Sequence, residues 1–453
     1  MRDFLPADVR RRDYVIGVIR EVYERYGFEP LETPAVENIE TLLGKYGEEG
    51  NQLIFKILKR GEHEKTGEAD LALRYDLTVP LARVVAEYGE RLPKFFKRYQ
   101  IQPVWRADRP ARGRFREFYQ CDVDAIGSRS MVVEAELCAA ASDALTRLGF
   151  TNFTIRLNHR RVLAGILGAS GIDAGLYADA LVALDKLDKI GAEGVARELS
   201  ERGVGDEAGR RLLDFFEGIS SLETAARIVA DDNAETEAQA LNSAVLGRLV
   251  EFIGAGDEAG ARGCEELREI LKYAEASGAS GRIRLDPSLA RGLSYYTGAI
   301  MEIAVPDLAG SLGGGGRYDN LVGMFSGRDV PACGFSLGLE RIVVVMSERE
   351  MFPSALVESP AELMVTIWNE ETIDEALRLA TELRARGLRV DVYPETDKLG
   401  KQLKYASSRG VPYVAVVGEE ERGRGVVMLK NMETGEQQAH RPEEIFDAVR
   451  GTQ

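Results

Sequence analysis

The residues best suited to chemistry lie in one short run, "ARGRFREFYQCDVDAI", at positions 111 to 126. Arg112 and Arg114 come early in the run, and Gln120, Asp122 and Asp124 follow them. Hydrogen-bond donors therefore give way to acceptors along the chain. Such a run forms either a solvated edge ribbon or the lining of a pocket that holds an anion at one end and a basic group at the other.

The wider segment from 94 to 116 is strongly basic. It carries eight Lys and Arg residues against Asp108 alone, a net charge of +7, in a chain whose formal net charge is −16. The overall acidity argues against unspecific coating of nucleic acid, whereas a local basic field is what a phosphate-bearing partner requires. A solvated basic edge is the alternative interpretation of this segment.

Composition narrows the class of protein. With 453 residues, 45% hydrophobic and 29% charged, the chain is long enough for two or three globular domains. It has no run of about 18 apolar residues that could span a membrane, and its N-terminus lacks the apolar segment of a signal peptide. Four separated cysteines without CxxC spacing and three scattered histidines favour a reduced, cytoplasmic protein that holds no metal.

The elements that must position these side chains follow from periodicity. Residues 8 to 26 predict a helix with an apolar stripe at i, i+3 and i+4 spacing, and short β-rich runs surround one helix between 71 and 126. Residues 170 to 280 predict a helical insertion. β-rich sequence resumes at "GRIRLDP" and continues to the glycine cluster "SLGGGGRYDNL". The sequence therefore predicts an α+β domain with an antiparallel sheet over residues 1–350.

A second domain follows a linker rich in Pro and Ser at residues 351–361. Beyond it, "LMVTIW", "LRVDVYP" and "YVAVVG" alternate with two helical segments. Alternation of strands and helices is typical of βαβ crossovers. Residues 362–453 are therefore predicted to form a small α/β domain.

Several motifs have an ordinary structural interpretation when taken singly. A phosphate-binding GxxxxGK[ST] loop is absent. The glycines of "GGGGRYDNL" favour a tight turn where two backbones approach. Asp76 could simply cap the helix that follows it, and Arg341, at the start of the helix in "GFSLGLERI", could form a surface salt bridge.

Taken together, the stretches resemble a known set. "YGFEPLETP" with Pro34, "RADRPARGRFREFYQCDVD" and "GFSLGLERI" resemble the three motifs of class II aminoacyl-tRNA synthetases, in that order. "LRYDLTVPLAR", "RGLSYYTGAIMEI" and "GGGGRYDNLVGMF" resemble segments specific to histidyl-tRNA synthetases, and "KLGKQLKYASSRGVPYVAVVGEEE" is similar to that family's C-terminal anticodon-binding domain. The resemblance covers nearly the whole chain. It implies ligation of L-histidine to tRNA(His) through a histidyl-adenylate, with release of AMP and diphosphate.

The resemblance also assigns roles around ATP. Amino-acid activation brings a carboxylate against the α-phosphorus of ATP, so catalysis needs fixed cations more than acid–base groups. By resemblance, Arg106 neutralises the α-phosphate, Arg114 contacts ATP, and Arg341 stacks on adenine opposite Phe118. Arg291 stands where this family places an extra arginine at the α-phosphate. Mg²⁺ accompanies the triphosphate, and no metal held by the protein is expected.

Selection of histidine needs polar partners for the imidazole ring, because ring size alone discriminates poorly. By resemblance, Asp124 and Tyr296 contact the imidazole, with Tyr295 adjacent. The positions that hold the α-amino and carboxylate groups are Asp76, Leu77, Thr78 and Gln120. The chain departs from the usual pattern at Ser294, where Asp is common, and at Asn320, where Gly is common.

Two surfaces are expected to meet tRNA. Arg112 and the basic run would contact the acceptor end, and Lys398, Lys401 and Lys404 recur at i, i+3 spacing along one helix of the C-terminal domain. An ordinary charged helix face is the alternative for the lysines. The family also implies a homodimer whose interface includes Pro34.

Two other functions remain open from the sequence. The chain could be a non-catalytic paralogue such as the regulatory subunit of ATP phosphoribosyltransferase, which typically lacks the anticodon domain and the arginines that grip ATP. It could also be a tRNA-sensing module of a larger protein. Exchange of pyrophosphate into ATP with each amino acid distinguishes these possibilities.

Overall fold

The computed structural model of the protein describes residues 1–59, 61, 67–229, 234–290, 295–306, 308–353, 356 and 361–451. These form two compact units, one of Met1–Leu5 and Arg12–Met351, the other of Pro6–Arg11 and Phe352–Gln453. No helix of the described residues is long and apolar enough to cross a membrane.

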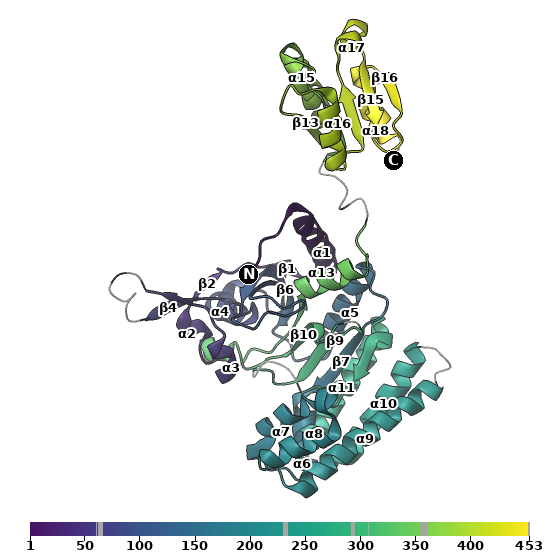
Figure 1. The fold of residues 1–453 in the computed structure, drawn as a ribbon. Helices are drawn as coiled ribbons and strands as arrows, with labels where there is room; N and C mark the ends of the chain where they lie inside the picture. The colour runs from purple at the N-terminus through teal and green to yellow at the C-terminus, as the bar shows by residue number, and fades with distance from the viewer. Residues whose placement is uncertain are drawn as a thin grey trace. The chain divides into compact units, whose positions relative to one another are not determined.

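An eight-stranded sheet forms the centre of the larger unit, in the order β1-β5-β6-β11-β10-β9-β7-β8 (Figure 1). Its neighbours pair antiparallel except for β1 with β5 and β7 with β8, which are parallel. The strands are β1 (Glu29–Pro30), β5 (Phe96–Trp105), β6 (Glu117–Ile126), β7 (Thr154–His159), β8 (Ile283–Leu285), β9 (Ala299–Ala304), β10 (Ser311–Arg317) and β11 (Ala332–Gly338).

Helices and a second sheet surround this one. On α1, Val15, Ile19, Val22 and Tyr23 of the predicted stripe are fully buried. A separate antiparallel sheet has the order β2-β4-β3. These elements are α1 (Pro6–Arg25), β2 (Val36–Asn38), α2 (Ile39–Leu42), α3 (Gly47–Gln52), β3 (Lys56–Leu58), β4 (Ala69–Leu73), α4 (Thr78–Tyr88), α5 (Val132–Arg147), α12 (Gly323–Ser326) and α13 (Leu339–Glu348).

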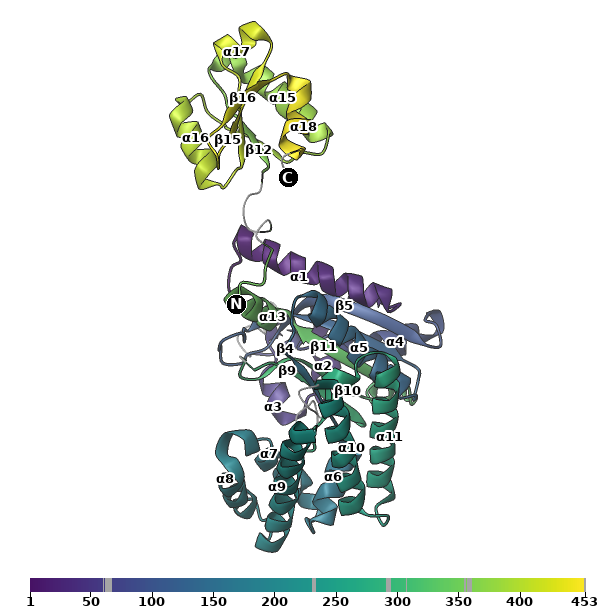
Figure 2. The same ribbon diagram turned by 90° about the vertical axis from the view of Figure 1, so that its right-hand side faces the viewer.

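The helical insertion gathers into one bundle beside β7 and β8 (Figure 2). The insertion begins earlier than predicted, since its first helix, α6, starts at Arg160. His159, buried at the end of β7, caps this helix: its side chain accepts a hydrogen bond from the N–H of Arg161. The helices are α6 (Arg160–Ala169), α7 (Tyr177–Leu184), α8 (Leu187–Glu201), α9 (Asp206–Val229), α10 (Ala234–Ile253) and α11 (Glu258–Ala276).

The smaller unit holds a five-stranded sheet in the order β13-β12-β14-β15-β16. β12 pairs parallel with β13 and β14, as βαβ crossovers require, whereas β15 and β16 add an antiparallel hairpin. Its elements are β12 (Leu363–Val365), α15 (Ile373–Ala385), β13 (Val390–Val392), α16 (Leu399–Ser408), β14 (Tyr413–Val416), α17 (Glu419–Arg424), β15 (Val427–Asn431), β16 (Gln437–His440) and α18 (Ile445–Arg450).

The predicted fold class is confirmed: an α+β unit with a largely antiparallel sheet and a helical insertion, followed by a small α/β unit. One local prediction was wrong. The glycine cluster is no turn but the middle of β10, between β9 and β11. The close approach of backbones was nevertheless correct, because a Cβ on Gly315 would lie 2.1 Å from the carbonyl oxygen of Gly334.

Candidate active site

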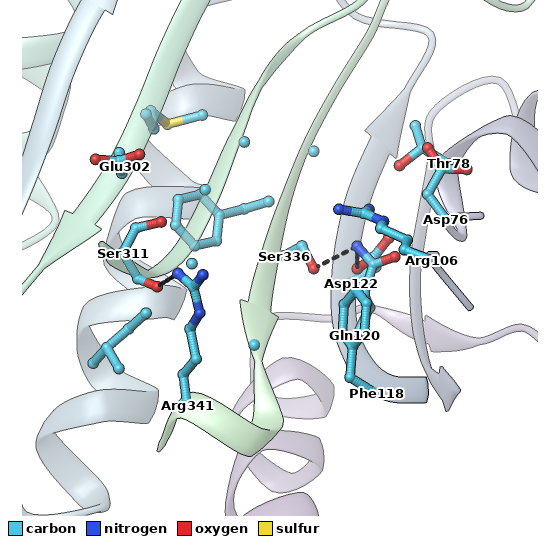
Figure 3. Close-up of a pocket in the computed structure, with 18 of the residues that line it drawn as sticks. Asp76, Thr78, Arg106, Phe118, Gln120, Asp122, Glu302, Ser311, Ser336 and Arg341 are labelled. Atoms are coloured by element: carbon cyan, nitrogen blue, oxygen red, sulfur yellow. Dashed lines mark hydrogen bonds between the residues drawn. The ribbon is translucent and has the colours of Figure 1, made fainter. Parts of the chain in front are cut away.

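A cavity of about 350 Å³ opens on the central sheet of the larger unit. Its walls come from the segment before α4, from the β5–β6 loop, and from β6, β10, β11 and the start of α13 (Figure 3). Ten of the residues singled out from the sequence line it: Asp76, Thr78, Arg106, Arg114, Phe118, Gln120, Asp124, Tyr295, Tyr296 and Arg341. Positions far apart in the chain therefore meet at one place.

Strand β6 supplies the acceptor side of the cavity. Side chains alternate between the two faces of a strand, so Gln120, Asp122 and Asp124 share the face that lines the cavity. Cys121 and Val123 occupy the opposite face and are fully buried in the core. The alternation of polar and apolar residues in "QCDVD" thus has a direct structural meaning.

Asp124 is held by two neighbours. The hydroxyl of Tyr318 donates a hydrogen bond to Asp124 Oδ1, and Arg98 Nη2 lies 2.9 Å from Oδ2. Both Arg98 and Asp124 are buried, with side chains 0% and 3% exposed. Burial raises the pKa of Asp124, and the charge of Arg98 acts in the opposite direction.

Asp76 serves the fold and the cavity at once. Its Oδ1 accepts a hydrogen bond of 3.1 Å from the N–H of Val79 in the first turn of α4, which is the helix-capping contact considered from the sequence. The hydroxyls of Tyr46 and Tyr295 donate to the same carboxylate at 2.9 and 3.1 Å. Burial raises its pKa, opposed by the bond from Val79 and by the charge of Arg106.

The glycines of β10 and β11 make room for these side chains. A Cβ at Gly334 would lie 1.8 Å from Asp124 Oδ1, and one at Gly313 would lie 2.5 Å from the carbonyl oxygen of Ser336. Only a residue without a side chain fits such positions. The glycine-rich strand therefore forms a flat backbone floor beneath the cavity.

Two arginines also line the cavity, Arg106 beside Asp76 and Arg341 on the opposite wall beside Ser311 (Figure 3). The Arg106 guanidinium lies between two rings, 4.3 Å from the centroid of Tyr75 and 5.2 Å from that of Phe118. Its Nε donates a 3.0 Å hydrogen bond to the carbonyl of Tyr75. Arg341, at the start of α13, donates from Nη1 to the carbonyl of Ser311 (Figure 3). These contacts fix the direction of two positive charges before any ligand binds.

Three predicted residues have other placements. Leu77 is buried and does not line the cavity; its carbonyl accepts a 3.2 Å hydrogen bond from Arg98 Nη2. Arg112 also lies outside the cavity lining and pairs with Glu348, its Nε being 2.9 Å from Oε1. Arg291, together with Ser294, falls outside the described residues.

The lysines of the smaller unit differ slightly from the predicted arrangement. Lys398 is the residue before α16 and not within it, while Lys401 and Lys404 lie in the helix. All three are exposed, and Lys401 pairs with Asp397 at 2.8 Å. The three cations still share one exposed end of the helix.

Sequence reasoning gave no individual role to several cavity residues. Asp122, Ser336, Glu340 and Tyr318 all line the cavity, and the Tyr318 hydroxyl also donates to Asp124. Burial raises the pKa of Glu340 to about 7, although the N–H of Tyr119 donates to it at 2.9 Å. The period-2 spacing of Asp122 between Gln120 and Asp124 was the available signal. Among the described residues, no group of three or more His, Cys, Asp and Glu is arranged to hold a metal ion.

The largely antiparallel sheet, with arginines of its hairpin loop and of the helix after β11 at one cavity, fits the class II aminoacyl-tRNA synthetases, to which histidyl-tRNA synthetases belong. The sequence model of the histidyl-tRNA synthetase family matches residues 1–342, and an anticodon-binding domain matches residues 359–452. The chain belongs to the histidyl-tRNA synthetase family, with the histidine–tRNA ligase activity that defines it.

Individual relatives agree over nearly the full length. A histidine–tRNA ligase of Porphyromonas gingivalis is 45% identical, covering 97% of this chain and 95% of the relative. The crystal structure of histidyl-tRNA synthetase from Nostoc superposes with a TM-score of 0.80 at 30% identity, covering 100% of this chain and 98% of that one. A structure from Bacillus halodurans, described as an ATP phosphoribosyltransferase regulatory subunit/histidyl-tRNA synthetase, has a TM-score of 0.70 at 23% identity, covering 92% and 97%. That last likeness concerns the fold alone.

Proposed function

We propose that this cavity is where L-histidine and ATP react to form histidyl-adenylate, which then charges tRNA(His). The observation that carries the proposal is that one cavity brings together two fixed cations, Arg106 and Arg341. The buried carboxylates Asp76 and Asp124 line the same cavity, with Arg106 beside Asp76. Such a combination suits a triphosphate and an amino acid with a basic side chain.

The arginines of the cavity lower the repulsion between two anions. The attacking carboxylate and the α-phosphate approach each other, and Arg106, already fixed by Tyr75, stabilises the charge that grows there. Adenine stacks between Arg341 and Phe118, and Arg114 contacts the phosphates. Arg291, by family resemblance, adds a further charge at the α-phosphate. ATP enters as its Mg²⁺ complex.

The carboxylates and their neighbours orient histidine. Asp76, Thr78 and Gln120 position the α-amino and carboxylate groups. Buried Gln120 Oε1 has no hydrogen-bond partner among the described residues and lies at the cavity, so a ligand N–H would satisfy it. Asp124, Tyr295 and Tyr296 surround the imidazole ring.

Binding of tRNA(His) would use both units. Arg112 with the basic β5–β6 loop would face the acceptor end, and Lys398, Lys401 and Lys404 would contact phosphates near the anticodon. We assign residues 1–350 to the catalytic domain, 351–361 to a linker and 362–453 to the anticodon-binding domain.

We further propose a cytoplasmic homodimer. Large apolar side chains are exposed on the β2-β4-β3 sheet: Val36 at 38%, Leu58 at 52% and Leu71 at 36%. Clustered exposed apolar residues are typical of an interaction surface. Pro34, expected at the dimer interface, lies two residues before β2.

The decisive test is pyrophosphate exchange into ATP with each of the twenty amino acids. Exchange with histidine alone would support the proposal. No exchange with any amino acid would refute it and would favour a non-catalytic paralogue.

A further inference from the structure

Asp122 is a buried carboxylate that lines the cavity. No individual role has been assigned to it above. It lies on β6 between Gln120 and Asp124, lines the cavity, and is 2% exposed (Figure 3). A carboxylate so deeply buried costs stability unless it is paired or protonated. Its partners therefore decide what it does.

Arg98, the cation nearest to Asp122, pairs more closely with Asp124. Arg98 Nη2 lies 2.9 Å from Asp124 Oδ2 but 3.9 Å from Asp122 Oδ2. Tyr318 also donates to Asp124, whereas Asp122 receives a long 3.4 Å hydrogen bond from Gln120 Nε2 and a contact from the Ser336 hydroxyl. Asp122 therefore keeps acceptor capacity for a ligand.

The charges around Asp122 leave an excess of carboxylates. The pKa of Asp122 is raised to about 7, chiefly by burial; the charge of Arg98 acts to lower it and that of Asp124 to raise it. Near neutral pH this carboxyl group therefore exchanges a proton readily. The titratable and charged groups that face it are Arg98 and Arg74 around β5 and β4, Asp124 and Cys121 on β6, Asp76 before α4, Tyr296 before β9 and Tyr23 on α1.

We propose that Asp122 shares one proton with the imidazole ring of bound histidine and is thereby a specificity-determining residue. This inference rests on the proposed placement of histidine in the cavity. In one form of the pair, the protonated carboxyl group donates to a neutral imidazole nitrogen. In the other form, the imidazolium N–H donates to the carboxylate. Both forms hold the same number of protons. A side chain without a basic nitrogen leaves the buried carboxyl group without a partner and is rejected.

Proton linkage gives this arrangement a signature. Free imidazole has a pKa of about 6.5, so at pH 8 both free Asp122 and free histidine have largely lost the proton that the bound pair holds. Binding at pH 8 must then take up nearly one proton from solvent. Histidine affinity should consequently fall by up to about tenfold per pH unit above roughly pH 7.5.

The experiment is calorimetry of L-histidine binding to the full-length protein at pH 8, in two buffers of different ionisation enthalpy. The wild type should take up close to one proton, and Asp122→Asn should take up almost none. Asp179→Asn, a half-exposed carboxylate of the helical insertion paired with Arg202, is the matched control and should behave as the wild type. Binding without proton uptake by the wild type, or equal uptake by Asp122→Asn, would overturn the proposal.

A second variant covers the case in which Asp122→Asn does not fold. The Ser336 hydroxyl lowers the pKa of Asp122, so Ser336→Ala should move the midpoint of proton uptake to higher pH. An unmoved midpoint would refute the role of Asp122. Histidine-dependent pyrophosphate exchange, measured on the same protein, distinguishes failure of this inference from failure of the proposed function. Exchange without proton uptake refutes only the shared proton. Absence of exchange refutes the proposed function.

Discussion

Replacing Gly334 by alanine tests whether the backbone floor of the cavity holds Asp124 in place. Gly334 on β11 pairs directly with Asp124 on β6 and with Gly316 on β10. The added Cβ would lie 1.8 Å from Asp124 Oδ1 and 2.6 Å from its Cγ. Because Tyr318 and Arg98 fix that carboxylate from other directions, it cannot move away without losing one of them.

The expected losses of activity and stability in Gly334→Ala follow from the two contacts of Asp124 that it disturbs. A hydrogen bond to a charged group contributes about 1.5–3 kcal/mol, which corresponds to roughly a 10- to 150-fold lower kcat/KM for histidine. Separating Asp124 from Arg98 breaks a buried ion pair, at a cost of about 3–5 kcal/mol in the free energy of unfolding. The ATP KM should change little, because the proposed ATP contacts come from Arg106 and Arg341 and not from Asp124.

Pyrophosphate exchange with histidine and ATP titrated separately, together with thermal unfolding, measures both effects. Gly247→Ala makes the same chemical change on α10, where nothing lies within 4 Å of the new Cβ. It should leave the histidine kinetics unchanged and should not lower the stability, because alanine favours a helix more than glycine does. In an Asp124→Asn background the effect of Gly334→Ala on histidine should be much smaller than in the wild type. A folded Gly334→Ala protein with a normal histidine KM would show that Asp124 does not depend on this floor.

Three further outcomes are expected. Arg291→Ala should lower kcat of adenylate formation by roughly 10²–10³-fold, the scale of single electrostatic stabilisers, with transfer of preformed adenylate to tRNA far less affected in rapid-quench kinetics. Changing exposed Lys401 and Lys404 to Glu should lower kcat/KM for tRNA(His) by about tenfold or more at low salt, because phosphate contacts are lost; equal losses in histidine activation would contradict this. Glu134→Gln should destabilise the fold by about 3–5 kcal/mol in urea unfolding, because it removes the buried partner of Arg317 at 2.6 Å; an unchanged midpoint would contradict the importance of this pair.

The sequence predicted those parts of the fold that are set by local patterns. The apolar stripe of α1 and the period-2 alternation of β6 are local, and both appear as expected. The cluster of glycines in β10 was misassigned because its cause is not local. It depends on backbones of β9 and β11 that come together only in the sheet.

The same limit applies to the site. Resemblance identified Asp124 and Gln120 as lining residues, yet it gave no sign that Arg98 and Tyr318 already engage Asp124. Those partners come from β5 and from the segment after β10, and their distances depend on strand register. Burial shifts the pKa of Asp122 and Glu340 for the same reason: the surroundings that desolvate a carboxylate are assembled by the tertiary structure.

One hairpin explains why a single run of sequence contains both kinds of charge. The β5–β6 loop carries Arg106 and Arg114, and β6 then extends from Phe118 to Asp124 along the cavity. A strand rises about 3.3 Å per residue, so these six steps span roughly 20 Å. Arginines and carboxylates that are neighbours in sequence therefore reach the cavity at different positions along one hairpin. The same short run thereby supplies both the cations proposed to meet a triphosphate and the carboxylates proposed to select a basic side chain.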